Sequence, residues 1–247
     1  MKAFILAAGV GSRLKPLTND KPKALVEVNG KPMLQVLIER LKAQGFNQLL
    51  INVHHYGDKI IDFLKQHDNF GIDIKISNEH DQLLDTGGAI VKAGWFFNGD
   101  SPVLVHNVDI FSDLDFKNLV QKHQNSKALI SLVVRERASS RKLLFDNNMQ
   151  LTGWRNVKTN EYKWVNEKQE QYYEIAYSGI YVASPDYPKQ IKNSGSFSII
   201  PQWLQIAKRH VIKANMHNEG LWFDLGSIDK IREAEKAITK IKLTNER

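Results

Sequence analysis

The sequence contains no cysteine and no long apolar run. Without cysteine, the chain can form neither a disulfide framework nor a thiolate metal site. No stretch approaches the roughly 20 apolar residues that a membrane-spanning helix needs. The first residues begin a strand pattern at once, without the basic head, apolar segment and small-residue cleavage site of a signal peptide. These absences predict a cytoplasmic protein with no membrane partner.

The positive charge of the chain is not concentrated in any one segment. The net charge is +7, but the 34 lysines and arginines are spread along the whole sequence. The sequence also lacks the aromatic signature of RNA-binding domains and the ligand spacing of zinc fingers. We therefore expect no nucleic-acid partner, and the excess charge suits a small anion such as a nucleotide or a sugar phosphate.

The first half of the sequence alternates between strand and helix patterns. The apolar runs and helical spacings predict strands at 2–6, 48–53, 72–77 and 102–108, with helices near 32–44 and 58–67. This alternation predicts an α/β fold with three α/β/α layers around a mostly parallel, Rossmann-like sheet. Ligands of such folds lie beyond the carboxyl ends of the strands.

The second half is less regular and richer in turn residues. Its apolar runs and helical spacings predict strands at 128–135, 142–146 and 177–184, and helices near 197–209 and 228–242. We expect the strands to form a small antiparallel appendage. The basic segments 135–142 and 153–164 are expected to be solvated loops, and the alternative is that they approach the sugar phosphate. Since no repeat or low-complexity linker interrupts the chain, residues 1–247 are expected to form a single domain.

A glycine-rich stretch, "LAAGVGSRLKPLTNDKPKALVEVNGKPML", follows the first predicted strand. Gly9 and Gly11 allow backbone N–H groups to approach a ligand closely. A dinucleotide-binding fingerprint would need a third glycine where Leu14 stands. A P-loop would need glycine in place of Leu25 and serine or threonine in place of Pro32. Both common nucleotide-binding motifs are therefore disfavoured, which leaves an ordinary strand-to-helix loop or another kind of phosphate site.

The same stretch carries two cations, Arg13 and Lys23. Nucleotidyl transfer depends on neutralising the charge of a triphosphate, and arginine provides a fork of donors while lysine provides a point charge. The two residues therefore favour a phosphate site over a simple connection.

The pattern L-A-A-G-x-G-x-R-L-x-P-L-T, followed by P-K and G-K-P-M-L, resembles the sugar-1-phosphate nucleotidyltransferases, also called nucleotide-sugar pyrophosphorylases. The resemblance implies a glycosyltransferase-A-like fold and the transfer of a nucleotidyl group from a nucleoside triphosphate to a sugar 1-phosphate, with release of pyrophosphate. It also implies nucleotide contacts by Leu6, Ala8, Gly9, Gly11, Ser12, Arg13 and Lys23.

Later blocks of the sequence agree with this resemblance. "DQLLDTGGA" resembles the glycine pair of the family that contacts the nucleobase, which implies that Gly87 and Gly88 bind the nucleotide, with Gln82 as a weaker candidate. "YSGI" resembles the sugar-binding block of the family, which implies that Ser178 and Gly179 lie under the sugar.

Two aspartates are expected at the ends of apolar strands, in "LVHNVDIF" and "GLWFDLGS". A carboxylate in such a position is costly unless it is paired or binds a metal ion. The blocks resemble the N-G-D and W-x-D-x-G motifs of the family, which implies that Asp109 and Asp224 bind Mg²⁺ and that Asn107 contacts a sugar hydroxyl. Val108 departs from the family pattern, which has glycine at this position.

The overall pattern looks most similar to the compact N-acetylmuramate-1-phosphate uridylyltransferases of cell-wall recycling. This resemblance favours UTP as the nucleotide, with Arg13, Lys23, Asp109 and Asp224 as the catalytic residues. Mannose-1-phosphate guanylyltransferase, another nucleotide-sugar pyrophosphorylase and phosphocholine cytidylyltransferase remain as alternatives. A dinucleotide oxidoreductase is disfavoured by Leu14, and an inactive nucleotide-binding regulator is disfavoured because both cations and both carboxylates are present.

Overall fold

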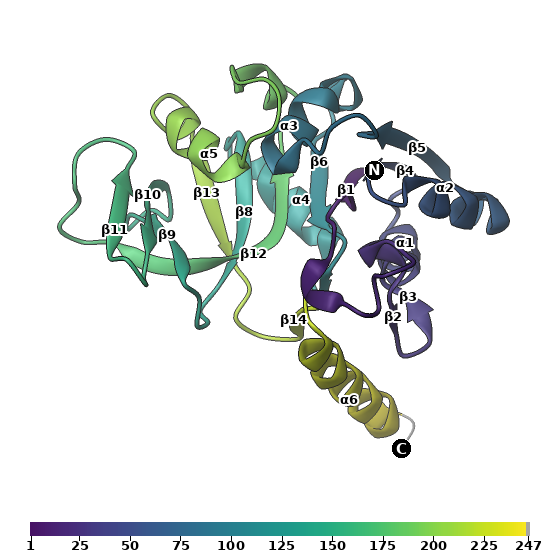
Figure 1. The fold of residues 1–247 in the computed structure, drawn as a ribbon. Coiled ribbons are helices and arrows are strands. Elements are labelled where there is room, and N and C mark those ends of the chain that lie inside the picture. The colour runs from purple at the N-terminus through teal and green to yellow at the C-terminus, as the bar shows by residue number, and fades with distance from the viewer. Residues whose placement is uncertain (246–247) are drawn as a thin grey trace.

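A computed structural model describes residues 1–245 of the chain, and its side chains as far as residue 238. Its centre is a mixed sheet of ten strands, shown in Figure 1. Four neighbouring strands are parallel: β5 (Asp73–Asn78), β4 (Gln48–Val53), β1 (Lys2–Leu6) and β6 (Val103–Asn107). The sheet continues through β12 (Tyr173–Ala183), which is antiparallel to β6 and β8, and ends with the parallel pair of β8 (Ile130–Arg135) and β13 (Ile212–Met216).

Helices cover both faces of the parallel strands because side chains alternate between the two faces of a strand. Phe4 and Leu50 pack in one core with α3 (Asp85–Lys92) and α5 (Ile199–Ala207). Ala3, Ile5 and Ile51 point the other way, into a second core formed with α1 (Met33–Ala43), α2 (Gly57–Gln66) and α4 (Phe116–Asn125). The prediction of three α/β/α layers is therefore confirmed.

An antiparallel appendage is also present, but only one of the three strands expected in it, 142–146, belongs to it. The other two lie in the main sheet as β8 and β12. The appendage consists of β9 (Arg141–Phe145), β10 (Leu151–Asn156) and β11 (Glu161–Trp164), and it joins the main sheet through the first residues of β12. Figure 1 shows these strands to one side of the parallel strands. The prediction that 153–164 is a solvated loop is wrong, since most of this segment forms the β10–β11 hairpin.

Two small sheets lie beside the main one. β2 (Glu27–Val28) pairs with β3 (Lys31–Pro32), and β7 (Ile110–Ser112) pairs with β14 (Trp222–Asp224). The last helix, α6 (Ile228–Asn245), begins directly after Ser227 as predicted, and Ile231 and Ala234 pack in a third core with Leu14 and Leu225. None of the helices in the described part of the chain combines the length and apolar character needed to cross a membrane.

Candidate active site

The glycine-rich loop leaves β1 and folds back on itself. Gly11 has a positive φ of 68° and precedes a short 3-10 turn over Ser12–Leu14. A Cβ atom at this position would lie 2.9 Å from Cβ of Lys23 and 3.1 Å from Cγ2 of Thr18. The Thr18 hydroxyl donates to the Gly11 carbonyl at 3.0 Å. Both the backbone conformation and the close approach therefore require glycine, and they bring Lys23 against the loop.

Two aspartates from distant parts of the sequence lie next to each other. Asp109 occupies the turn between β6 and β7, and Asp224 is the last residue of β14. Since β14 pairs with β7, Asp224 lies opposite Ile110. The Leu225 N–H also donates to the Asp109 carbonyl at 2.7 Å. Both aspartates therefore lie beyond the carboxyl end of β6.

Each aspartate faces a lysine. Lys23 forms an ion pair with Asp109, and these side chains are only 13% and 17% exposed. Lys230 Nζ lies 3.0 Å from Oδ2 of Asp224, whose Oδ1 accepts from the Gly226 N–H at 2.9 Å. Burial alone would raise the pKa of Asp224, but Lys230, the Gly226 N–H and Lys23 together hold this pKa below its ordinary value. Asp224 is therefore ionised at neutral pH.

Arg13 reaches the same place from the glycine-rich loop. Its side chain lies so close to Gly226 that a methyl group there would be 2.9 Å from Nη2 of Arg13 and 2.7 Å from Oδ1 of Asp224. Two cations from one loop thus lie beside two carboxylates, one from the turn before β7 and one from the end of β14. Such a set of groups suits a polyphosphate together with a divalent cation.

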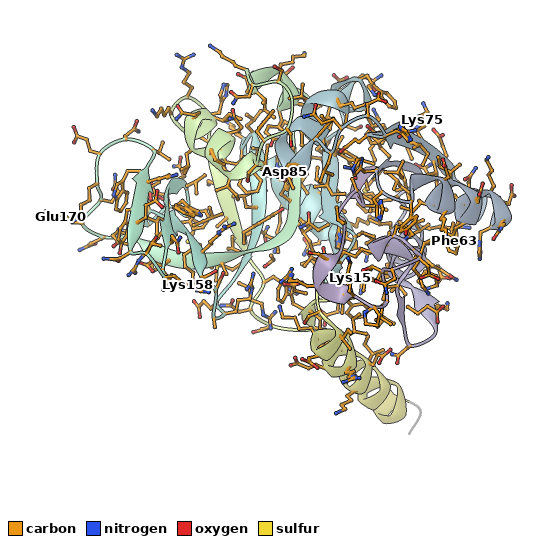
Figure 2. The ribbon with its side chains drawn as sticks, in the orientation of Figure 1. Lys15, Phe63, Lys75, Asp85, Lys158 and Glu170 are labelled. Atoms are coloured by element: carbon orange, nitrogen blue, oxygen red, sulfur yellow. The ribbon has the colours of Figure 1, made fainter. Side chains whose placement is uncertain are left out.

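A cavity of about 630 Å³ opens beside these groups. Its walls come from the glycine-rich loop, β4, the segment between β5 and α3, and the turn after β6. The predicted residues that line it are Leu6, Ala8, Gly9, Arg13, Lys23, Asn107 and Asp109. In Figure 2, the labels of Lys15 and Asp85 mark the loop and the start of α3. Seven of the predicted residues thus converge on one cavity.

The remaining predicted residues lie outside that lining. They are Gly11, Ser12, Gln82, Gly87, Gly88, Ser178, Gly179 and Asp224. Gln82 is exposed. The segment after β5 instead contributes Leu83, Asp85 and Thr86 to the cavity.

The glycine pair of α3 packs against the segment before α5. A Cβ atom on Gly87 would overlap the ring of Phe197, and one on Gly88 would overlap the carbonyl oxygen of Gly195. The N–H of Gly87 donates to the Phe197 carbonyl at 2.8 Å. The expectation that both amides face a nucleobase therefore does not hold for Gly87, and close packing is what requires the two glycines here.

Two of the three residues predicted for the sugar, Ser178 and Gly179, lie where β12 departs from regular pairing, between Tyr177 and Tyr181. Gly179 has a φ of 80°, and a Cβ atom there would be 3.2 Å from Nδ2 of Asn107 and 2.7 Å from Cγ1 of Ile110. Asn107 and Gly179 are therefore neighbours. Ser178 is fully buried, so its side chain is not open to a sugar in this conformation.

Arg137, a cation of the basic segment 135–142, lies beside this region. The guanidinium of Arg137 lies 4.4 Å from the centre of the Trp222 ring and donates to the Tyr177 carbonyl at 2.9 Å. The Trp222 indole N–H donates in turn to the Ser178 carbonyl at 3.0 Å. Burial lowers the pKa of Arg137, and the charge of Asp224 opposes this shift. The expectation that 135–142 is a solvated loop is therefore wrong for Arg137.

Sequence reasoning also missed Asn52 and Glu79, which line the same cavity. These side chains are only 3% and 1% exposed. Asn52 interrupts an apolar strand, and Glu79 directly follows the end of β5. The argument that singled out Asp109, a carboxylate at the end of a strand, applies equally to Glu79 and could have found it.

The donor set fits magnesium only in part. Among the described residues, no group of three or more His, Cys, Asp or Glu side chains is arranged to hold a metal ion. Asp109 and Asp224 together offer two hard carboxylate ligands. Because Mg²⁺ is commonly held by one or two carboxylates together with water and substrate phosphates, the pair fits this ion once a phosphate-bearing substrate completes the set.

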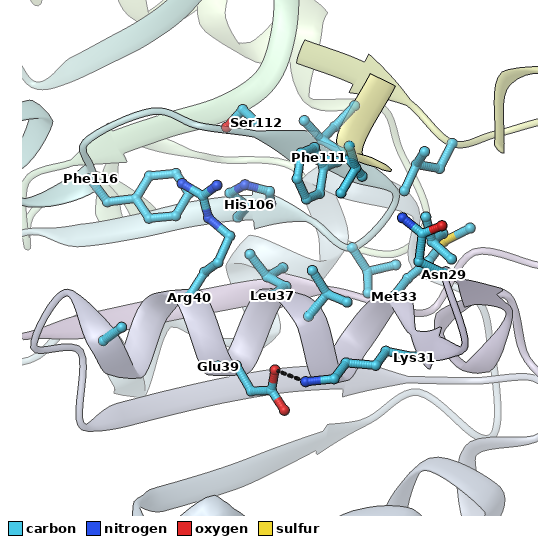
Figure 3. A pocket seen from close by; sticks show the side chains of 17 residues that line it. Asn29, Lys31, Met33, Leu37, Glu39, Arg40, His106, Phe111, Ser112 and Phe116 are labelled. Atoms are coloured by element: carbon cyan, nitrogen blue, oxygen red, sulfur yellow. Dashed lines mark hydrogen bonds and ion pairs between the residues drawn. The ribbon is translucent and has the colours of Figure 1, made fainter. Parts of the chain in front are cut away.

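A second cavity has a volume of about 450 Å³. Figure 3 shows the side chains that line it. Val108, Ile110 and Leu225, the neighbours of Asp109 and Asp224 in sequence, form part of its wall. The rest is largely apolar, and the Lys31–Glu39 ion pair of 2.8 Å lies along one side. Such a lining does not suit a polyphosphate.

Comparison with known proteins places the chain in a family. Residues 2–241 match the model of the family described as nucleotidyl transferase. An N-acetylmuramate α-1-phosphate uridylyltransferase from Neisseria meningitidis is 30% identical over 95% of this chain and 97% of its own length. One from Caulobacter vibrioides is 43% identical, but over only 43% of this chain and 45% of the relative. A mannose-1-phosphate guanyltransferase from Kluyveromyces lactis is 36% identical over 50% of this chain and 35% of its own.

Solved structures share the fold. HddC from Yersinia pseudotuberculosis, in complex with GMP-PN, has a TM-score of 0.74 and is 25% identical, with 96% of this chain and 99% of HddC covered. A UDP-glucose pyrophosphorylase in complex with UDP-glucose also has a TM-score of 0.74, over 97% and 98% of the two chains, at 20% identity. With a family model that spans nearly its whole length, the chain belongs to the nucleotidyl transferase family, among the sugar-1-phosphate nucleotidyltransferases.

Proposed function

We propose that the protein transfers a uridylyl group from UTP to N-acetylmuramate 1-phosphate, which gives UDP-N-acetylmuramate and pyrophosphate. The observation that carries the proposal is that Arg13, Lys23 and Asp109 line a cavity of about 630 Å³. Asp224 lies outside this lining but beside Asp109 and Arg13. The choice of substrate is supported by the Neisseria relative, which is similar over nearly the full length of both chains.

In the proposed reaction, an oxygen of the sugar 1-phosphate attacks the α-phosphorus of UTP. The bond from that phosphorus to the oxygen bridging the α- and β-phosphates breaks, and pyrophosphate leaves. Arg13 binds the departing β- and γ-phosphates, and Lys23 neutralises charge on the α-phosphoryl group or on the sugar phosphate. No covalent intermediate with the protein is needed, since both reactants are held together in the cavity.

Asp109 and Asp224 are the proposed ligands of Mg²⁺. When bound, this ion neutralises charge on phosphate oxygens. Both carboxylates face lysines in the structure. The charge of each carboxylate is therefore balanced by its lysine or by a bound Mg²⁺.

The surroundings of Arg137 support a sugar that carries its own negative charge. N-acetylmuramate has a carboxylate on its lactyl group, unlike the neutral hexoses. Arg137 is half-buried, and its hydrogen bonds go to the carbonyls of Tyr177 and Ala138. The charge of Asp224 also acts on Arg137, but the hydrogen bonds of the guanidinium go to neutral carbonyls, which leaves the group able to bind an external anion.

A guanylyltransferase is the second candidate. The mannose-1-phosphate guanyltransferase from Kluyveromyces lactis and HddC in complex with GMP-PN support it, the first over half of this chain. CTP with phosphocholine is a further alternative that belongs in the same test.

A matrix of substrates tests these alternatives. Each of the four nucleoside triphosphates is combined with N-acetylmuramate 1-phosphate, N-acetylglucosamine 1-phosphate, mannose 1-phosphate, glucose 1-phosphate or phosphocholine, and pyrophosphate release is measured with Mg²⁺. We expect the highest kcat/KM for UTP with N-acetylmuramate 1-phosphate. The highest value elsewhere in the matrix would refute the proposed substrates, and no turnover anywhere would refute the activity.

Asp109→Asn and Asp224→Asn test the metal assignment in the same assay. Loss of a group that stabilises charge in the transition state typically lowers kcat by about 10² to 10³. We expect a loss of this size for each variant. Turnover close to that of the wild type at saturating Mg²⁺ would contradict the assignment.

A further inference from the structure

Two buried polar side chains connect the two loops that border the nucleotide cavity. The N–H of Ala7 donates to Oδ1 of Asn52 at 2.7 Å. Nδ2 of Asn52 donates to Oε1 of Glu79 at 2.7 Å. The other carboxylate oxygen of Glu79 accepts from the N–H of Leu84 at 3.0 Å. A continuous chain of three hydrogen bonds therefore runs from the residue after β1 to the residue before α3.

The pair itself cannot shift easily. Asn52 lies inside β4, in register with Leu6 of β1. The N–H of Glu79 donates to the Val53 carbonyl at 2.8 Å, and the Glu79 carbonyl accepts from Nδ1 of His54 at 2.8 Å. Both side chains thus start from backbone that the neighbouring parallel strands of Figure 1 hold in place.

The two ends of the hydrogen-bond chain lie on the backbone of two loops. Ala7 begins the glycine-rich loop that carries Arg13 and Lys23, and Leu84 directly precedes Asp85, which has a left-handed φ of 54°. Asn52, Glu79 and residues of both loops line the same cavity. The hydrogen-bond chain therefore sets the distance between two opposite walls of the cavity.

A buried asparagine–glutamate pair costs more free energy than an apolar contact would at the same place. Glu79 is only 1% exposed, and its carboxylate oxygens accept from neutral donors, an amide side chain and a backbone N–H. A buried carboxylate without a cationic partner costs several kcal/mol compared with a packed apolar side chain. Directional hydrogen bonds are what an apolar pair at this place could not supply.

We propose that Asn52 and Glu79 are positioning residues, which fix the spacing of the Ala7 loop and the Leu84 loop around the nucleoside triphosphate. The proposal rests on the proposed function, since it takes the cavity as the nucleotide site. The pair acts through the backbone of the two loops and makes no contact with the reacting phosphates. Its loss weakens binding of the nucleotide, raising the KM for the triphosphate much more than it lowers kcat.

Exchanging the amide and the carboxylate between positions 52 and 79 tests this role. Glu79→Gln places an amide N–H₂ against the N–H of Leu84 or against Nδ2 of Asn52, and Asn52→Asp places two carboxylates together. In the variant with both changes, the new carboxylate at position 52 accepts from the N–H of Ala7 and from the new amide at position 79. The oxygen of that amide accepts from the N–H of Leu84. All three hydrogen bonds are thus restored, with the donor and the acceptor between the two side chains exchanged.

Steady-state kinetics with each variant give the decisive numbers. We expect each single variant to raise the KM for the triphosphate about tenfold, as for a lost buried hydrogen bond, and to lower kcat less than threefold. The double variant is expected to return within about threefold of the wild type. A double variant no better than the worse single variant would overturn the proposal, as would single variants with an unchanged KM. If the single variants do not fold, the recovery of folding and KM in the double variant is the supporting result.

A buried hydrogen bond elsewhere provides the control for stability. Ser131→Ala removes the 2.8 Å contact with Nδ1 of His123, far from the cavity lining. We expect it to lower the melting temperature and to leave the KM for the triphosphate unchanged. A rise in that KM as large as in Glu79→Gln would show that general destabilisation explains the effect, against the proposal.

Calorimetric titration with UTP, GTP, CTP and ATP separates this inference from the proposed function. A wild-type protein that binds none of them would refute the nucleotide site itself. Binding by the wild type and equal binding by both single variants would refute only the role of Asn52 and Glu79.

Discussion

Replacing Lys23 by glutamine should separate the catalytic role of this residue from its structural one. Lys23 is the ion-pair partner of Asp109, and both side chains are largely buried, at 13% and 17% exposed. Glutamine keeps most of the length of the side chain but removes its charge. The substitution therefore withdraws a cation from the phosphates and also leaves Asp109 without its partner.

The substitution should lower both the unfolding free energy and the turnover, and the two effects should respond differently to magnesium. Breaking a fully buried ion pair by removing one partner destabilises a protein by about 3–5 kcal/mol, and an exposed pair contributes about 0–1 kcal/mol. Because Lys23 and Asp109 keep a little exposure, we expect a loss of about 2–3 kcal/mol of unfolding free energy. Turnover should fall by about 10² to 10³, as for other groups that stabilise transition-state charge.

Magnesium should offset only the loss of unfolding free energy. If Asp109 is a magnesium ligand, the ion competes with Lys23 for this carboxylate in the wild type but not in the variant. Millimolar Mg²⁺ should therefore raise the unfolding free energy of Lys23→Gln more than that of the wild type, while the kcat of the variant stays low.

Urea unfolding with and without Mg²⁺, and pyrophosphate release, measure these effects. Lys15→Gln is the matched control, because Lys15 is an exposed lysine of the same loop and should tolerate the change with little effect on either measurement. Turnover of Lys23→Gln within threefold of the wild type would refute the catalytic role. An equal response of both proteins to Mg²⁺ would refute the competition for Asp109.

Contacts elsewhere in the chain lead to three further predictions. Gly88→Ala should lower the unfolding free energy by about 1–3 kcal/mol in urea, because its Cβ would overlap the Gly195 carbonyl, whereas Gly94→Ala, with its nearest neighbour at 3.6 Å, should be nearly neutral. Burial lowers the pKa of His123 from 6.5 to about 4. The unfolding free energy should therefore be highest above about pH 6.5 and decrease by up to about 3 kcal/mol as the pH falls towards 4, because the unfolded protein binds the proton first. A urea midpoint that does not change over this range, or the same pH dependence in His123→Gln, would contradict this. Arg137→Gln should raise the KM for N-acetylmuramate 1-phosphate about tenfold and leave that for glucose 1-phosphate little changed, and equal effects on both would show that Arg137 does not recognise the carboxylate.

The parallel half of the fold could be predicted because each strand and helix there carries its own signal. The runs at 2–6 and 48–53 match β1 and β4 to the residue. The helix α4 (Phe116–Asn125) and the strands β13 and β7 were not predicted. A strand that ends at Asp224 was expected and is present as β14, although β7 and β14 are both only three residues long. Such short strands form only because another segment pairs with them, so their own residues carry little information.

The parts of the candidate site that lie on one continuous segment were easier to predict than the parts that tertiary contacts bring together. Arg13 and Lys23 lie on one loop with a distinctive sequence, and both line the cavity. The glycine pair of α3 shows the opposite case, because a glycine accommodates a ligand or a neighbouring segment equally well, and only the structure shows Phe197 and Gly195 against it. The positions of Asn52 within an apolar strand and of Glu79 directly after a strand indicated burial. The sequence could not show which backbone groups these side chains would bind.

Asp224 depends most on tertiary structure, because the segment that leads to it has no regular structure of its own. Arg135, at the end of β8, donates to the carbonyls of His217 and Gly220 at 2.8 and 3.1 Å, and the Asp113 carboxylate accepts from the Leu221 N–H at 2.8 Å. These bonds hold the chain immediately before β14, and the pairing of β14 with β7 then sets Asp224 beside Asp109. The first half of the chain thus supplies the loop and one carboxylate, but the second carboxylate is in place only when the last part of the chain has folded onto the sheet.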